Sequence, residues 1–388
     1  MLPLKDLKII EFCEIAAGPY CGMLLADMGA EIIKVERAQG DAMRMWPPIS
    51  EGNSENFASV NRGKKSVIID LKSASGVNAA KALILSADAV IENFRPGVMK
   101  RNGIDYDAMS ALKPELVYCS ISAFGQSGPR SQEGGFDLTM QAMAGVMSIT
   151  GEPGGAPVKC GVPLCDFVSG LYGAFAISAA MREVALTGKG QNIDVAMLGA
   201  TLAIAALQTS EYFGTGRDPQ KLGSAHPRNA PYQAFRAQDG HFGMAAGNNK
   251  LWRSVCEVVG RVDLVEVERF ASPSQRAANQ KELLAILEAI FTTQPVSHWL
   301  DQFAKAGVPC SAIKTYSEAL ADPQVVHMGW VQDLLLPGGR ETKTFGSPIR
   351  FNDQQNKILT PPPALGEHTD EVLSELAISG DEKTSGAA

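Results

Sequence analysis

The sequence predicts an α/β fold in which helices cover both faces of a parallel β-sheet. Short β-rich runs alternate with helical patterns through the first half of the chain, and this alternation is typical of βαβ units. Hydrophobic residues make up 45% of the 388 residues, which is a globular composition. The length predicts about two or three domains.

The N-terminal elements are predicted in order from their residue patterns. Residues 8–12 are rich in β-formers and form the first strand. A helical pattern at 17–28 ends at Gly29, a residue suited to the left-handed turn that closes a helix. Further strands are predicted at 31–35, 66–69, 89–92 and 116–121, with a helix at 74–85. Ligands of parallel sheets bind beyond the carboxyl ends of the strands, which here points to residues 11–18, 36–41, 70–72 and 93–97.

A second, smaller α+β unit is predicted to follow a cluster of Gly, His, Pro and Asn at 221–231. Residues 232–243 predict a hairpin that turns at Gln238-Asp239-Gly240. Amphipathic helices are predicted at 251–259, 276–291 and 296–306. The chain then returns to a β pattern at 331–336 and 347–351, and it ends in a small polar tail.

Charge and cysteine usage exclude several classes of protein. Lys and Arg number 35 against 42 Asp and Glu, and the resulting net charge of −7 disfavours a general nucleic-acid binder. Seven scattered cysteines without a CxxC pair indicate reduced thiols, and five histidines without HExxH spacing predict no metal site. Lys5, Asp6 and Lys8 interrupt any N-terminal apolar segment, so the chain is predicted to be cytoplasmic.

Two uncharged runs, at 167–181 and 195–210, are predicted to be buried helices rather than membrane spans. Each is shorter than the roughly 20 residues that a span needs. Gly170, Gly173, Ala174 and Ala176 predict close packing of the first run on its neighbours. The sequence contains neither a GxGxxG after the first strand nor a GxxxxGK[ST], which disfavours a dinucleotide site and a P-loop.

One acid stands out by its position. Asp166 follows a loop rich in Gly and Pro at 151–163 and directly precedes the first uncharged run. The pattern alone favours an N-cap, because a carboxylate at a helix start accepts backbone N–H bonds and is stabilised by the helix dipole. The same physics also leaves a second interpretation open, in which the ionised carboxylate is a nucleophile.

Several segments, covering most of the chain, carry a resemblance to a known family. They are AGP at 17–19, LADMGAEIIKVE at 25–36, NRGKKS at 61–66, DLK at 70–72, ENFRPG at 92–97, SAFGQSGP at 122–129, GVPLCD at 161–166, GKGQ at 188–191 and IDVAM at 193–197. Together they resemble the class III CoA-transferases, the family of formyl-CoA transferase and carnitine CoA-transferase.

This resemblance implies an architecture. Members combine a Rossmann-like large domain with a smaller α+β domain and form a homodimer of interlocked rings. By that resemblance, residues 1–220 and 329–375 form the large CoA-binding domain and residues 221–328 the small one. The small polar composition of the last residues predicts a disordered tail at 376–388.

The resemblance also implies a reaction. In this family an aspartate attacks an acyl-CoA thioester, passes through a mixed anhydride and an aspartyl-CoA thioester, and delivers CoA to a carboxylic acid. Asp166 stands at the position of that aspartate. No permanently bound cofactor, metal, nucleic acid or membrane is expected, and acyl-CoA and the carboxylic acid are the substrates.

The CoA-binding positions of the family carry over by the same resemblance. Arg101 is suited to a phosphate because its guanidinium is a forked donor. Formyl-CoA transferases often have Gln where this chain has Ala16. Asp137 has an alternative interpretation as a helix N-cap. The full set is Ala17, Arg37, Ile69, Leu71, Lys72, Asn93, Phe94, Arg101, Phe136 and Asp137.

The substrate prediction rests on the segment MAAGNNK at 244–250, which replaces the consecutive glycines of formyl-CoA transferases. With 223–227 and 230–235 it resembles branches that act on short dicarboxylates such as succinate, glutarate or oxalate, so succinyl-CoA is the expected donor. His226, Arg228, Gly247 and Asn248 are the candidate substrate residues.

Two other functions stay open. The related α-methylacyl-CoA racemases use a His and an Asp as an acid/base pair, but Phe136 stands where that His belongs. A non-catalytic CoA-binding protein is disfavoured because Asp166 is present.

Overall fold

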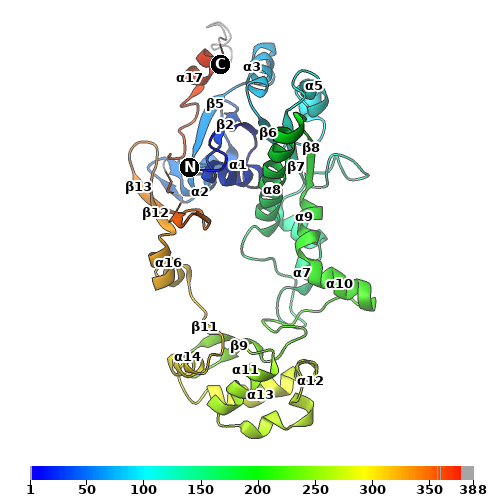
Figure 1. Ribbon diagram of the computed structural model, residues 1–388, viewed down its shortest axis with the longest axis vertical. Coiled ribbons are helices and arrows are strands. Elements are labelled where there is room, and N and C mark those ends of the chain that lie inside the picture. The colour runs from blue at the N-terminus through cyan, green and yellow to red at the C-terminus, as the bar shows by residue number, and fades with distance from the viewer. Residues whose placement is uncertain (1, 356, 359, 377–388) are drawn as a thin grey trace. The chain divides into compact units, whose positions relative to one another are not determined.

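The computed structural model describes residues 2–355, 357–358 and 360–376 (Figure 1). The predicted tail lies outside the described residues from 377 onward. The chain has two compact units. The larger runs to Val146, from Lys159 to Gly216 and from Pro323 onward, and the smaller comprises Met147–Val158 and Arg217–Asp322. The domain ranges expected from the sequence stay predictions.

The larger unit contains the parallel sheet that the sequence predicts. Its six strands lie in the order β5-β2-β1-β6-β7-β8, and every neighbouring pair is parallel. The chain therefore winds outward in both directions from the β1–β6 pair, which makes this pair the switch point where ligands of such sheets bind. The strands are β1 (Lys8–Phe12), β2 (Glu31–Glu36), β5 (Lys64–Ile68), β6 (Ala89–Glu92), β7 (Val117–Ser122) and β8 (Asn192–Ala196).

Helices cover both faces of the central strands of this sheet. Successive residues of a strand point to opposite faces, so neighbouring residues pack in different clusters. Ile9 packs in the cluster formed with helices α1 (Ala17–Asp27) and α8 (Leu164–Thr187). Its neighbour Ile10 packs in the cluster of α3 (Ala74–Leu85). Figure 1 shows α1 and α8 side by side along the sheet. The prediction of helices on both faces is confirmed.

Helices α1 and α8 lie in close contact, as the small residues of the first uncharged run predict. A Cβ on Gly170 would lie 2.7 Å from the Ala17 carbonyl oxygen, and one on Gly173 would lie 3.0 Å from the Cys21 sulfur. Only glycine allows this approach, so the N-terminal turns of the two helices are held together.

The outward faces of the uncharged runs differ from the prediction. By length and composition α8 is apolar enough to cross a membrane, yet one side packs on α1 and β7 as a core helix does. Its other side is exposed, with Phe175 at 73%. The second run is not one buried helix, because Val195 pairs with Ile121 in the sheet and residues 197–215 form two helices. These are α9 (Met197–Ile204) and α10 (Ala206–Thr215), and α10 buries none of its residues.

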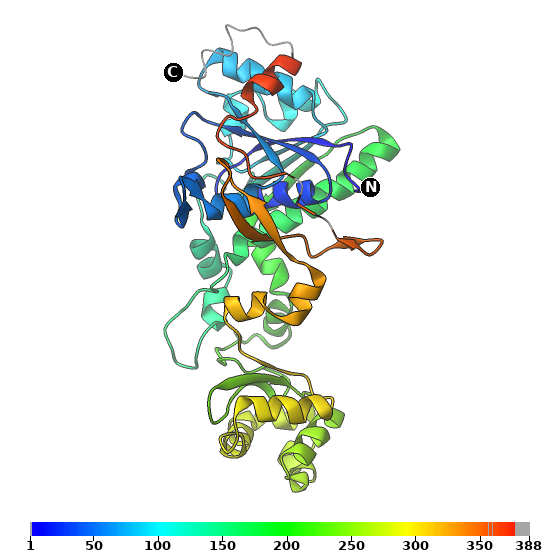
Figure 2. The same ribbon diagram turned by 90° about the vertical axis from the view of Figure 1, so that its left-hand side faces the viewer.

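The C-terminal segment packs back onto the larger unit (Figure 2). The hairpin of β12 (Val331–Leu335) and β13 (Glu341–Phe345) buries Leu334 against Ala58 of α2 (Glu55–Asn61). Further on, the Thr369 hydroxyl accepts from the Ile68 N–H, and this covers the edge of β5. The predicted strand at 347–351 is shorter, as β14 (Arg350–Phe351).

The smaller unit contains an antiparallel sheet in the order β11-β10-β9. Strands β9 (Tyr232–Arg236) and β10 (His241–Ala245) form the predicted hairpin, and β11 (Cys310–Ala312) pairs with β10. Helices α11 (Asn249–Val258), α13 (Gln280–Phe291) and α14 (Val296–Lys305) share its aromatic core. The predicted helix at 276–291 is wrong as one element, because α12 (Pro273–Ala278) and α13 are separated at Asn279.

Candidate active site

A cavity of about 480 Å³ lies at the switch point of the larger unit. Its walls are formed by the segments at the carboxyl ends of three neighbouring strands. These are residues 14–17 after β1, residues 93–96 after β6 and residues 121–123 at the end of β7. Residues 133–136, Arg37, Met197 and Asp166 complete them. The carboxyl ends of parallel strands meet at one edge of the sheet, which explains why segments far apart in sequence converge here.

Asp166 lies in the first turn of α8 and lines this cavity. The N-cap of α8 is Pro163, so the interpretation of Asp166 as an N-cap is wrong. The helix starts at Leu164, two residues before Asp166, so the Asp166 side chain lines the cavity instead of capping the helix end. Within the described chain, the Asp166 carboxylate takes part in no hydrogen bond or ion pair.

Asp137 caps α8 from outside that helix. One of its carboxylate oxygens accepts from the N–H of Cys165 at 2.8 Å, and the other accepts from the Gln141 amide at 2.7 Å. Asp137 is the first residue of α6 (Asp137–Met143), whose N-cap is Phe136. The alternative that Asp137 caps its own helix is therefore wrong, because its carboxylate is engaged by α8.

The environment of Asp166 favours its protonated form. Burial first, and the negative charge of Asp137 second, raise the pKa of Asp166 to about 7. The dipole of α8 acts in the opposite direction, since it stabilises an anion in the first turn. A carboxyl with a pKa near neutrality is ionised in a large fraction of molecules while staying poorly solvated, and such groups cluster at functional sites.

Five of the predicted CoA-binding residues line the cavity: Ala17, Arg37, Asn93, Phe94 and Phe136. Asn93 is committed to the chain itself. Its amide donates to the Glu14 carbonyl at 2.8 Å and accepts from the Glu14 N–H at 3.0 Å. Arg37 donates to the Gly40 carbonyl and lies 3.4 Å from the Glu14 carboxylate. Both residues therefore shape the wall after β1.

The other predicted CoA-binding residues lie outside the lining of this cavity. Ile69 is buried in the core beneath α3, and Leu71 packs against the same core. Lys72 and Arg101 are exposed at the surface of the larger unit. Asp137 acts through the start of α8 as described above.

The four candidate substrate residues all belong to the smaller unit, and two of them have evident structural roles there. Asn248 is the N-cap of α11 and accepts from the Leu251 N–H at 2.9 Å. The His226 ring stacks on Tyr232 with 5.0 Å between ring centroids, and its Nδ1 accepts from the Arg228 N–H. Gly247 and Arg228 complete the predicted set.

Arg95 is a cavity residue that sequence reasoning did not single out. It lines both this cavity and a neighbouring one of about 380 Å³, and its guanidinium approaches Gly134. In the described chain Arg95 forms no ion pair, whereas Arg37 lies beside Glu14. A signal was present, because Arg95 follows β6 directly after Asn93 and Phe94.

Comparison with known proteins settles the family. The model of CoA-transferase family III matches residues 4–369. The chain belongs to this family. The enzyme is thus a CoA-transferase (EC 2.8.3.-) that acts on acyl-CoA substrates, which confirms the resemblance seen in its sequence segments.

Relatives of this CoA-transferase cover nearly its whole length. It is 37% identical to a succinate–glutarate CoA-transferase of Agrobacterium fabrum, over 96% of each chain. It is 35% identical to an acetyl-CoA:oxalate CoA-transferase of Acetobacter aceti, over 97% of this chain and 96% of that one. The crystal structure of a CaiB/BaiF family protein from Brucella suis matches with a TM-score of 0.85 and 39% identity, over 97% of this chain and 99% of that one.

Proposed function

We propose that this CoA-transferase moves CoA from succinyl-CoA to a short dicarboxylic acid, through covalent intermediates on Asp166. The observation that carries the proposal is the Asp166 carboxylate itself, which lines the switch-point cavity without a hydrogen bond from the described chain. The dicarboxylate preference is supported by the relatives, which are named for glutarate and oxalate.

The proposed reaction conserves the energy of the thioester. An Asp166 oxygen attacks the thioester carbonyl carbon, the C–S bond breaks, and CoA leaves as a thiolate. The thiolate then attacks the Asp166 carbonyl of the mixed anhydride, so the donor acid departs as a carboxylate and an aspartyl-CoA thioester remains. The acceptor carboxylate attacks this thioester and expels the thiolate, which finally attacks the acceptor acyl carbon and frees Asp166. No net proton is consumed.

The cavity supplies two physical contributions to this chemistry. Burial removes water from the Asp166 carboxylate, which weakens its solvation and is reflected in the raised pKa of about 7. Arg37 and Arg95 place positive charge on the walls that receive the anionic substrates.

The covalent step is tested by trapping. With succinyl-CoA and hydroxylamine, mass spectrometry should find a hydroxamate at Asp166, and Asp166→Asn should form none and lose transfer. The matched control is Asp370→Asn, an acid in the first turn of α17 (Thr369–Glu375), which should retain activity. Transfer at a near wild-type rate in Asp166→Asn would show that Asp166 is not the nucleophile.

The substrate class is tested with a panel of acids. Succinate, glutarate, oxalate and matched monocarboxylates are offered as acceptors, and CoA esters are measured. Turnover with none of the dicarboxylates would overturn the substrate proposal while leaving the family assignment intact. Exchange of an α-proton without transfer would point to a racemase, and binding without either reaction to a CoA-binding protein.

We also propose that the enzyme is a homodimer. Large apolar side chains lie exposed along α8, α9 and α10, including Phe175 at 73% and Phe213 at 82%. Exposed apolar surface of this extent is typical of a protein interface. Sedimentation or light scattering should give twice the chain mass, and a monomer at micromolar concentration would contradict the proposal.

A further inference from the structure

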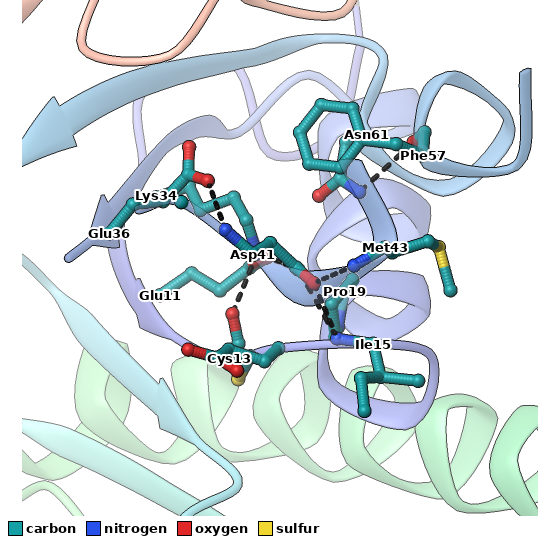
Figure 3. Close-up of polar contacts among 12 residues, drawn as sticks. Glu11, Cys13, Ile15, Pro19, Lys34, Glu36, Asp41, Met43, Phe57 and Asn61 are labelled. Carbon is teal, nitrogen blue, oxygen red and sulfur yellow. Dashed lines mark hydrogen bonds and ion pairs between the residues drawn. The ribbon is translucent and has the colours of Figure 1, made fainter. Parts of the chain in front are cut away.

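Four fully buried charged side chains lie beneath the loop after β1, and Figure 3 labels three of them, Glu11, Lys34 and Asp41. Lys34 lies 3.1 Å from Glu11 and 3.0 Å from Asp41, and Lys64 lies 2.8 Å from the other oxygen of Glu11. Two positive and two negative charges therefore balance. Taking such a group out of water is costly, and its ion pairs must offset that cost.

The loop is held at three consecutive residues. Lys34 donates to the Cys13 carbonyl at 2.6 Å, and Asn93 bonds both backbone groups of Glu14. The Ile15 N–H points between the two oxygens of Asp41, at 3.1 and 3.2 Å, as Figure 3 shows. Each contact comes from a different part of the fold, so the backbone path of the loop is over-determined.

Ile15 occupies a backbone conformation that its side chain disfavours. Its φ is +70°, in the left-handed region, which a β-branched residue rarely adopts. Such strain persists only where the surroundings enforce it, and it clusters at functional sites. Ile15, Ala16 and Ala17 all line the cavity that contains Asp166, and α1 starts at Ala17 without a side-chain cap.

We propose that Asp41 is a positioning residue for CoA transfer: its carboxylate holds Ile15 in the left-handed conformation and so fixes residues 14–17 on the wall facing the substrate. The inference rests on the proposed role of Asp166, because the wall matters through its position relative to that nucleophile. Without the Asp41 acceptor, Ile15 relaxes to negative φ and displaces Ala16 and Ala17. Small displacements of this kind cost about a hundredfold in rate when they misplace reacting groups.

A double-mutant cycle tests whether Asp41 acts through the conformation of Ile15. Asp41→Asn should lower kcat about tenfold or more, since the neutral amide is a weaker acceptor for the strained N–H. In an Ile15→Gly background the same Asp41→Asn change should lower kcat less than about twofold, because glycine adopts positive φ without help. Equal losses in the two backgrounds, or no loss in either, would overturn the proposal.

Controls separate positioning from folding and from the nucleophile. Asp41 also accepts from the Met43 N–H and pairs with the buried Lys34, so its loss has a structural cost. Asp27→Asn removes a comparable partner of Arg62, at 2.8 Å, away from the loop, and should lower Tm while retaining kcat. Hydroxylamine should still trap Asp166 in Asp41→Asn, only more slowly, whereas failure to trap it in the wild-type enzyme would instead remove the proposed nucleophile.

A second measurement leaves Asp41 in place. Ile15→Gly should unfold at a higher temperature than Ile15→Ala, because alanine is strained at φ +70° and glycine is not. This order is the reverse of the usual one for the two residues. A higher Tm for Ile15→Ala would remove the strain on which the inference depends.

Discussion

The carboxylate of Asp137 accepts the N–H of Cys165, the residue immediately before Asp166, at 2.8 Å. Asp137 thus caps the first turn of α8, and its negative charge, after burial, helps to raise the pKa of Asp166 in that turn. Position and acidity of Asp166 therefore depend on the same neighbour.

The pH dependence of CoA transfer should reveal the effect of Asp137 on the pKa of Asp166. The raised pKa of Asp166, about 7, predicts a rate that climbs through neutral pH as the carboxylate ionises. Asp137→Asn removes the charge but keeps an acceptor for the Cys165 N–H, so the climbing limb of kcat/KM should move to lower pH. Asp370→Asn is the matched control, and an unmoved limb in Asp137→Asn would contradict the assigned cause.

Stability should depend on pH through the same group. Its pKa is raised from 3.8 to about 7 in the folded chain, so its contribution is complete below about 3.8 and is lost as pH rises through 7. Asp166→Asn lacks this loss. The free energy of unfolding of the variant should therefore gain up to about 4 kcal/mol over that of the wild type between acid and mildly basic pH, measured by denaturant unfolding. If the difference in unfolding free energy between Asp166→Asn and the wild type did not change with pH, the burial of an ionisable Asp166 would be contradicted.

Arg95 should contribute to substrate binding. Arg95→Gln removes a cavity cation, and loss of a charge-assisted hydrogen bond should raise KM by about tenfold or more with little change in kcat. An increase for every acyl-CoA would indicate contact with CoA, and an increase for dicarboxylate acceptors alone would indicate contact with the remote carboxylate. Arg261→Gln, which removes an exposed ion pair with Asp263, is the control, and an unchanged KM throughout would exclude Arg95 from binding.

The contact between α1 and α8 should be sensitive to a single methyl group. Gly170→Ala places a Cβ 2.7 Å from the Ala17 carbonyl oxygen, so the helices must separate, at a cost of about 1–3 kcal/mol. Activity should also fall, because Ala17 and Asp166 line the cavity from the starts of these two helices. Thermal unfolding of both variants measures this cost. Gly199→Ala is the control, because its new Cβ would lie 3.7 Å from the nearest atom, and it should be neutral or stabilising.

Local patterns predicted much of the fold. Strands β1 and β6 and helix α3 have the bounds expected from their residues, and Gly29 closes α1 with φ +102°. Predictions failed where distant partners decide. Val195 looked helical but joins the sheet beside Ile121, and the apolar side chains of α10 find no core in the described chain.

The candidate site divides in the same way. Asp166 was recognised because it sits in a characteristic segment, but its place in the first turn of α8 was not. Asp41 lies in the segment 36–41 expected at the ligand-binding edge, but its role was not predicted, because its contact with Ile15 spans 26 positions. Arg95 was overlooked although its neighbours Asn93 and Phe94 were identified.

The sequence by itself determined the α/β class, the positions of most main strands along the chain, the family and the acid proposed as nucleophile. These follow from periodic burial and from runs of neighbouring residues, which are visible along the chain. Only the tertiary structure decided which loops meet at the cavity, that Asp137 lies against α8, and that Asp41 holds Ile15. Carboxylates acquire such partners when strands far apart in sequence align their carboxyl ends, so these contacts exist only in the folded chain.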